Sequence, residues 1–141
     1  MEDKEKKAQE LYMEFQVLDQ HIKQVQQQLE AVTHQLIELS STRNSLDELN
    51  KVMSGREVFV PISSGIFAKA NLHETSELLV NVGASVLVKK DIDSTKSLIQ
   101  KQFEELKKIH QQMAEDLEKM KNHAAQMEVQ LQGLVSEEQS S

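Results

Sequence analysis

The sequence has no cysteine, no tryptophan, a single proline and only four glycines among its 141 residues. Without cysteine, disulfides, thiolate metal sites and thiol catalysis are excluded. Gly55, Gly65, Gly83 and Gly133 are too dispersed for a phosphate-binding loop, so nucleotide hydrolysis is not expected. Hydrophobic residues make up 38% of the chain and aromatic residues 4%, which is less than a compact enzyme of this size normally buries. We therefore expect neither enzymatic activity nor a bound cofactor.

Positive charge is also in short supply. The formal net charge is -7, which opposes binding to nucleic acid or to anionic membrane, because phosphate contacts need clustered Lys and Arg. No run of 18 apolar residues occurs, and no apolar run follows the charged N-terminus, so we expect neither a membrane span nor a signal peptide. The five histidines form no HExxH motif and no close pair, and the position of His34 places it on an outer helix face. We therefore expect structural or surface roles for them rather than a metal site.

What the sequence has instead is two long runs of apolar residues at alternating spacings of four and three. A mean spacing of 3.5 keeps these side chains on one face of a helix and is typical of a left-handed coiled coil. The first run comprises Leu11, Phe15, Leu18, Ile22, Val25, Leu29, Val32, Leu36 and Leu39. It can be extended to Met53, where Ser54 and Gly55 end the helix. The second run comprises Ile99, Phe103, Leu106, His110, Met113, Leu117, Met120, Ala124, Met127, Leu131 and Leu134.

Two polar residues occupy positions in these apolar runs. His110 interrupts the second run, and Arg43 falls on the extension of the first. A polar residue at such a position commonly fixes the register of the helices or the choice of partner. The alternative is a side chain that extends its polar end into solvent, and this reading is favoured for Arg43.

Between the two runs the period of the apolar residues changes to two, which predicts β-strands. Residues 57–62 and 65–70 flank Ser63-Ser64 and form a first predicted hairpin, in which Gly65 takes the positive-φ position. Residues 78–82 and 86–90 flank residues 83–85 and form a second. Residues 58–68 carry no charge that would protect a strand edge, and Pro61 fits only an edge or a bulge. This predicts an oligomerisation module whose apolar residues are Val58, Val60, Ile62, Ile66, Phe67, Leu79, Val80, Val82, Val86 and Val88.

These patterns together predict a mainly α fold with a small β module. In this fold a long antiparallel two-helix coiled coil has its helices joined by two tandem β-hairpins. The expected parts are a first coiled-coil helix at 1–54, the hairpins at 55–90, a second coiled-coil helix at 91–135 and a polar tail at 136–141. Asp91 or Asp93 is expected to cap the second helix. If the helices double back, facing residues have numbers that sum to about 145, so Leu11 should lie near Leu134.

Additional apolar residues lie beside the seam at the predicted end of the coiled coil that is farthest from the hairpins. They are Tyr12, Met13, Val17, Val129 and Val135. A two-stranded coil cannot fully cover positions next to its seam, so part of this surface should be open to a partner. The alternative, that these residues widen the core or are scattered surface side chains, stays open.

The middle of the chain also carries a family resemblance. Residues 58–70 and residues 79–88, followed by Lys89-Lys90-Asp91, resemble the alpha-class subunit of prefoldin. The order of long helix, two hairpins and long helix extends the resemblance over essentially the whole chain. Beta-class subunits carry one hairpin, so two hairpins indicate the alpha class, and the compact chain with short tails favours the archaeal type.

The resemblance implies an ATP-independent chaperone that holds unfolded polypeptides and delivers them to a group II chaperonin in the cytoplasm. It also implies a hexamer of two alpha and four beta subunits, in which the hairpins assemble into an oligomeric β-barrel body and the coiled coils project from it. Unfolded clients are held at the ends of the coiled coils. In this sequence the client-binding residues would be Leu11, Tyr12, Met13, Phe15, Val17, Met127, Leu131, Leu134 and Val135. The competing hypothesis is a structural coiled-coil adaptor that oligomerises through its hairpins and binds one folded partner.

Overall fold

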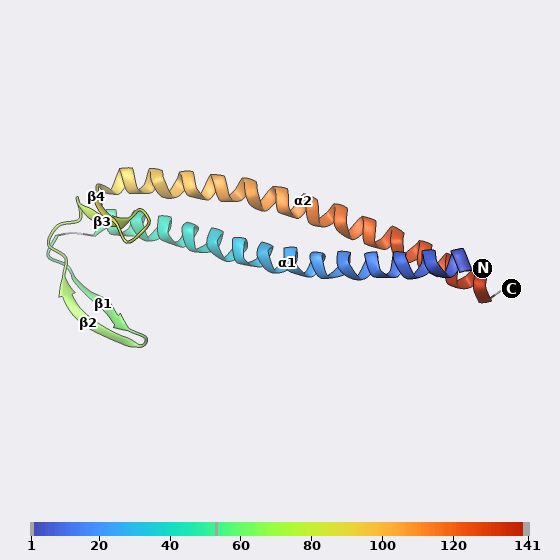
Figure 1. Ribbon diagram of the computed structural model, residues 1–141. Helices are drawn as coiled ribbons and strands as arrows, with labels where there is room; N and C mark the ends of the chain where they lie inside the picture. Colours follow the sequence, from blue (N-terminus) through green and yellow to red (C-terminus); the bar gives the residue numbers. More distant parts are fainter. Residues whose placement is uncertain (1, 53, 140–141) are drawn as a thin grey trace. The chain divides into compact units, whose positions relative to one another are not determined.

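The structure, a computed structural model, describes residues 2–52 and 54–139. Two long helices have two β-hairpins between them in the chain (Figure 1). The elements are α1 (Glu2–Lys51), β1 (Glu57–Ser63), β2 (Ile66–Asn71), β3 (Leu78–Asn81), β4 (Leu87–Lys90) and α2 (Ile92–Gln139). This order confirms the predicted fold class. The predicted last residue of the first helix, Met53, lies outside the described residues, and α2 continues four residues beyond the predicted end at Val135.

The chain divides into two compact units. The first, called here the helical unit, contains α1 up to residue 35 and α2 from residue 106. The second, called the hairpin unit, contains residues 36–105, which include the end of α1, both hairpins and the start of α2.

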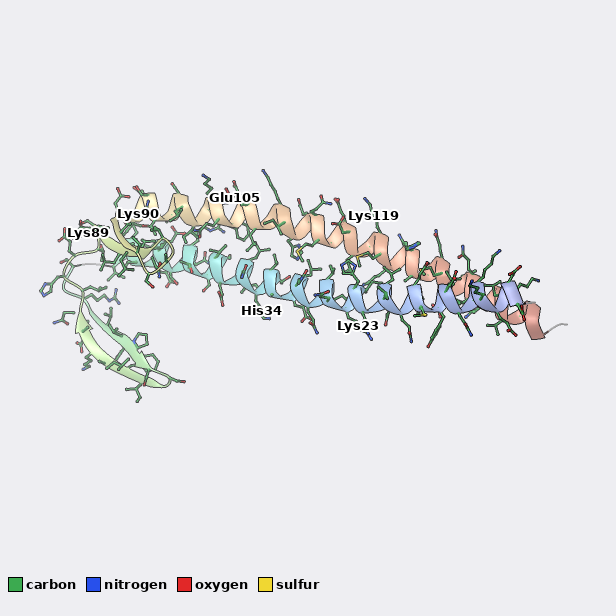
Figure 2. The ribbon with its side chains drawn as sticks, in the orientation of Figure 1. Lys23, His34, Lys89, Lys90, Glu105 and Lys119 are labelled. Carbon is green, nitrogen blue, oxygen red and sulfur yellow. The ribbon has the colours of Figure 1, made fainter. Side chains whose placement is uncertain are left out.

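The core of the helical unit is the predicted seam between its two helical segments. Ile22, Leu117 and Met127 are buried, and the other members of both apolar runs in this unit are half-buried. Charged and polar side chains lie on the outer faces: Lys23 and His34 are on the outer side of α1, and Lys119 is on the outer side of α2 (Figure 2). The seam is only partly covered because, in a two-stranded coil, each helix shields just one side of the other.

Cross-helix polar contacts establish that the two helices run antiparallel. In the helical unit, Nε2 of His110 lies 3.1 Å from Oγ1 of Thr33. In the hairpin unit, Nη1 of Arg43 donates to Oε1 of Gln100 at 2.6 Å. In both pairs the residue numbers sum to 143, close to the predicted value of about 145. The apolar spacing alone therefore predicted the register to within about two residues.

Both polar residues in the apolar runs are bonded across the seam. Thr33 donates its hydroxyl hydrogen to the carbonyl oxygen of Leu29, so its oxygen is left to accept from Nε2–H of His110. Arg43 bonds Gln100 and also lies over the ring of Phe103, with 5.8 Å from its guanidinium carbon to the ring centroid. These contacts favour a register-fixing role for both residues over extension into solvent.

The first hairpin pairs β1 with β2 in an antiparallel register. Gly65 has a φ of +80° and closes the turn, as predicted. Pro61 pairs with Phe67, and the register shifts between Pro61 and Ser63, so the proline borders a bulge. The predicted position of Pro61 at an edge or bulge is confirmed, because the irregularity removes the need for a backbone N–H there.

The second hairpin pairs β3 with β4 around a tight loop. The N–H of Val82 donates to the carbonyl oxygen of Val86, and the N–H of Gly83 donates to Oδ1 of Asn81. Ala84 and Ser85 have φ values of 50° and 62°, a region that favours glycine. The loop therefore holds two non-glycine residues in the left-handed conformation.

The start of α2 is capped by Asp91, one of the two predicted residues. Its Oδ1 accepts a hydrogen bond from the backbone N–H of Ser94 at 2.7 Å. The N–H and the hydroxyl of Thr95 both donate to the carbonyl oxygen of Asp91. Thr95 and its neighbour Ile92 are buried, so the capped turn is also packed.

Candidate functional site

The first turns of α1 lie beside the last turns of α2 in the helical unit (Figure 1). We define the tip region as residues 2–21 and 123–136. Three grooves run along the seam here, and each is lined by residues from both helices. Each groove has residues of the half-covered seam at its floor.

The structure divides the nine predicted client-binding residues into three groups. Tyr12, Met13, Val17 and Val135 are exposed on the surface of the tip region. The residues Leu11, Phe15, Leu131 and Leu134 are half-buried in the seam. Met127 is 4% exposed and belongs to the core. The four exposed side chains are open to a partner, and the half-buried four form groove floors.

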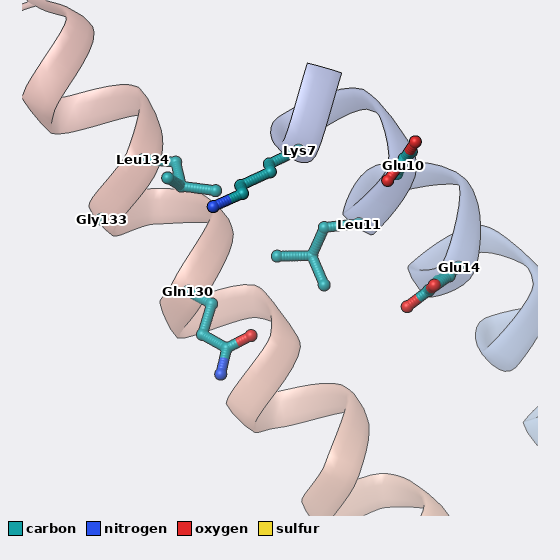
Figure 3. Close-up of a pocket in the computed structure, with 7 residues that line it drawn as sticks. All are labelled: Lys7, Glu10, Leu11, Glu14, Gln130, Gly133 and Leu134. Carbon is teal, nitrogen blue, oxygen red and sulfur yellow. The ribbon is translucent and has the colours of Figure 1, made fainter. Parts of the chain in front are cut away.

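Two of the grooves adjoin on one side of the seam. Groove A, about 500 Å³, is lined by Lys7, Glu10, Leu11, Glu14, Gln130, Gly133 and Leu134. Leu11 and Leu134 project into the space between the helices, and the Lys7 side chain reaches toward α2 (Figure 3). Groove B, about 390 Å³, is lined by Met13, Glu14, Val17, Leu18, His21, His123 and Met127. Because Glu14 lines both grooves, they form one continuous surface.

The third groove is lined by a different set of residues. Groove C, about 530 Å³, is lined by Tyr12, Phe15, Glu128, Leu131, Gln132, Val135 and Ser136. Its lining shares no residue with groove A or groove B. The tip region therefore offers two separate apolar surfaces to a partner.

Sequence reasoning missed several residues that shape these surfaces. Glu10, Glu14 and Glu128 line the grooves although they are not apolar. Val129 is 70% exposed in the tip region but lines none of the three grooves. The heptad position of Glu14, directly before the seam residue Phe15, is a signal that would have identified it as a wall residue.

The hairpins offer another candidate binding surface, in addition to the tip region. Of the ten predicted oligomerisation residues, Val58 and Val80 are half-buried and the other eight are exposed. Phe59 and Leu87, which were not among the ten, are exposed as well. Each hairpin forms its own two-stranded sheet, and such a sheet is marginally stable by itself in water.

Two carboxylates in the hairpin unit are electrostatically perturbed. The Ser94 hydroxyl, and after it the Ser94 backbone N–H, hydrogen bond to Asp91 and hold the pKa of its carboxyl below the ordinary value. The ammonium of Lys96 bonds Asp47 and likewise lowers the pKa of that carboxyl. Lys96 lies on α2 and Asp47 on α1, so this ion pair joins the two helices.

Across 2–52 and 54–139, no helix has an apolar stretch long enough to span a bilayer. Within the same ranges, no three His, Asp or Glu side chains gather closely enough to hold a metal ion.

The sequence was also compared with known protein families and curated proteins. The profile of the prefoldin family, described as prefoldin subunit, matches residues 18–137. Prefoldin subunit alpha from Methanobrevibacter smithii is 36% identical over 95 residues, which cover 67% of this chain and 64% of the relative. Prefoldin subunit alpha 1 from Thermococcus kodakarensis is 30% identical over 95 residues, 67% of this chain and 65% of the relative. Prefoldin subunit alpha from Thermofilum pendens is 28% identical over 80 residues, which cover 57% of this chain and 62% of the relative. The chain thus spans less than two thirds of the length of each of these relatives.

A solved structure has the same fold. The cryo-EM structure of filamentous PFD from Methanocaldococcus jannaschii aligns with a TM-score of 0.67 and covers 92% of this chain and 98% of its own. The sequence identity is 14%, so this likeness concerns the fold alone.

Proposed function

The chain belongs to the prefoldin family and is of the archaeal alpha type, and on this premise we propose that it is a subunit of an ATP-independent holding chaperone. In this proposal the subunit captures unfolded polypeptides at its tip region and delivers them to a group II chaperonin in the cytoplasm. This activity needs no catalytic residue and no cofactor, because holding an apolar segment requires only reversible contacts.

One observation carries the proposal of client capture: exposed apolar side chains gather in the tip region around grooves with apolar floors. Tyr12, Met13, Val17 and Val135 are exposed there, and each lines groove B or groove C. Unrelated unfolded chains differ in sequence, so a surface that binds many of them needs several weak and adaptable contacts. Methionine suits this because its side chain is flexible and polarizable.

We further propose that the hairpins assemble with beta subunits into a hexamer of two alpha and four beta chains around an oligomeric β-barrel body. Support comes from the exposed apolar faces of β1 to β4 and from the open edges of two separate two-stranded sheets. Several tip regions on one body would raise the effective concentration of every contact after the first. Holding then becomes firm while each single contact stays weak.

Deleting residues 1–14 and 129–141 tests the assignment of client capture to the tip region. We expect the truncated chain to assemble with a beta subunit but to suppress the aggregation of denatured proteins less well. Aggregation is followed by light scattering on two unrelated denatured proteins at stoichiometric chaperone. Full suppression by the truncated chain would refute the assignment. If the intact chain suppresses neither protein and binds one folded partner, the adaptor hypothesis replaces the chaperone.

A separate experiment tests the proposed assembly. The chain is mixed with a candidate beta subunit, and the mass of the complex is measured by sedimentation. We expect a mass equal to two alpha and four beta chains. A chain that remains a well-folded monomer with every candidate beta subunit would contradict the proposal, since the hairpins would then need no partner.

A further inference from the structure

Grooves A and B together set the length of client segment that fits. Their lining on α1 runs from Lys7 to His21. At a rise of about 1.5 Å per residue these fourteen steps extend over roughly 21 Å. An extended polypeptide rises about 3.3 Å per residue, so about six residues fit along this surface. A helical segment of the same length would hold about fourteen residues, but unfolded clients present extended chain.

The walls of this surface carry negative charge. Glu10 and Glu14 line it, and neither forms an ion pair with another residue in the described ranges. Glu128 lines groove C and is equally without an ion-pair partner there. Lys7 is the single Lys or Arg among the residues that line the three grooves. The grooves therefore combine an apolar floor with carboxylate walls.

The excess of acid belongs to the tip region and not to the whole helical unit. Residues 2–21 contain six acidic residues against three lysines, and residues 123–136 contain one acidic residue and no Lys or Arg. The adjoining segments of the unit, residues 22–35 and 106–122, contain four acidic residues and five lysines. The negative potential is thus localised where the exposed apolar side chains are.

We propose that the tip region selects extended client segments of about six residues in which apolar side chains are flanked by Lys or Arg. This inference rests on the proposed function and names the class of segment that it takes. The apolar side chains cover the groove floor, and one flanking cation approaches Glu10 or Glu14, which lie about 6 Å apart along α1. Segments flanked by Glu or Asp are disfavoured because like charges meet at the walls. Since the carboxylates are exposed, the electrostatic contribution is screened by salt and each contact stays reversible.

The test uses three fluorescently labelled peptides with the same apolar centre and with Lys, Ser or Glu at both flanks. Binding to the full-length chain is measured by fluorescence anisotropy. We expect the Lys-flanked peptide to bind most tightly and the Glu-flanked peptide least tightly. Each exposed pair contributes up to about a fivefold change in affinity. The difference should shrink between 50 and 500 mM NaCl, a change that shortens the Debye length to a few ångströms.

A charge-neutralising variant locates the effect. Glu10→Gln with Glu14→Gln should remove most of the preference for Lys flanks, so that the Lys-flanked and Glu-flanked peptides bind with similar affinities. The matched control is Glu115→Gln with Glu118→Gln, which removes the same charge from exposed positions outside the tip region. The control should keep the full preference.

The outcomes separate this inference from the function on which it rests. Equal binding of all three peptides, or an unchanged preference in the Glu10 and Glu14 variant, overturns the inference and leaves client capture standing. Failure of all three peptides to bind, together with failure to suppress aggregation, overturns both. If self-association excludes the peptides and is lost in Met13→Gln with Val17→Gln, the grooves hold a second copy of the chain and the inference is wrong.

Discussion

Replacing Met13 and Val17 with glutamine removes two apolar side chains from groove B without disturbing the seam. They are 66% and 69% exposed, so most of their surface is in water when no client is bound. Burying an apolar side chain of this size completely is worth about 1.5–3 kcal/mol. A client that covers about half of the exposed part gains about 0.5–1 kcal/mol from each. The double variant should therefore lose about 1–2 kcal/mol, or roughly five- to thirtyfold in affinity for one client segment.

The fold should tolerate the change. Substitutions at exposed positions usually alter stability by less than about 0.5 kcal/mol, and glutamine favours a helix at least as well as valine does. We therefore expect an unchanged melting temperature by circular dichroism. Affinity is measured by anisotropy of a labelled unfolded polypeptide, first with the chain alone and then with the assembled complex. Avidity among several tip regions should enlarge the loss in the complex.

A matched control tests whether the location of the apolar surface matters. Ile37 and Ile109 are 60% and 52% exposed on the helices but lie outside the tip region. Replacing both with glutamine removes a similar amount of exposed apolar surface, so a general effect of hydrophobicity would weaken binding equally in the two double variants. Equal losses, or no loss from the Met13 and Val17 variant, would refute the assignment of client binding to the tip region.

Four further predictions concern the stability of the fold. Asp91→Ala should lower the free energy of unfolding while Asp91→Asn keeps most of the cap, as measured by urea denaturation; equal stability of both variants would contradict the capping role. Because the pKa of Asp91 is lowered in the folded state, the charge-dependent part of its contribution should be present at neutral pH and be lost as the pH falls below about 4; a wild-type advantage over Asp91→Ala that is as large at pH 2 as at pH 7 would contradict this. His110→Leu should raise the melting temperature, because Thr33 keeps its hydrogen bond to Leu29 and no donor is orphaned; a lower melting temperature would show that the cross-helix bond outweighs apolar burial. Gly65→Ala should lower the free energy of unfolding by about 1–2 kcal/mol, because a φ of +80° strains any residue that has a Cβ. Amide hydrogens of β1 and β2 should then exchange faster, and unchanged exchange would contradict the strain.

The seam was predictable because the heptad spacing alone decides which side chains face the other helix and are buried there. Every residue of the two apolar runs is buried or half-buried, and the register differs from the predicted one by about two in the sum of residue numbers. The bulge at Pro61 followed from its missing N–H, and the turn at Gly65 followed from its tolerance of positive φ. In each case one local physical constraint leaves few alternatives.

Other features depend on geometry that a spacing pattern does not contain. Met127 and Leu131 are both seam residues, yet one is buried and the other half-buried, because coverage depends on which side chains of the facing helix lie over each position. The left-handed conformations of Ala84 and Ser85 fall on residues with no preference for them, since the loop between β3 and β4 imposes the backbone path. The groove walls were missed for a different reason: a pattern of apolar residues omits Glu14, although its position directly before the seam residue Phe15 places it beside grooves A and B.

The hairpins and the tip region differ in the kind of binding that their backbones permit. A hairpin edge presents unpaired N–H and C=O groups, so a partner strand must match its direction and register to bond with them. In the tip region the backbone hydrogen bonds of α1 are satisfied within the helix, and only side chains are offered to a partner. Side-chain contacts of this kind impose no register on the bound segment. We therefore expect the hairpins to bind their partner in one defined geometry and to dissociate from it slowly. The tip region should accept segments of many sequences and exchange them quickly.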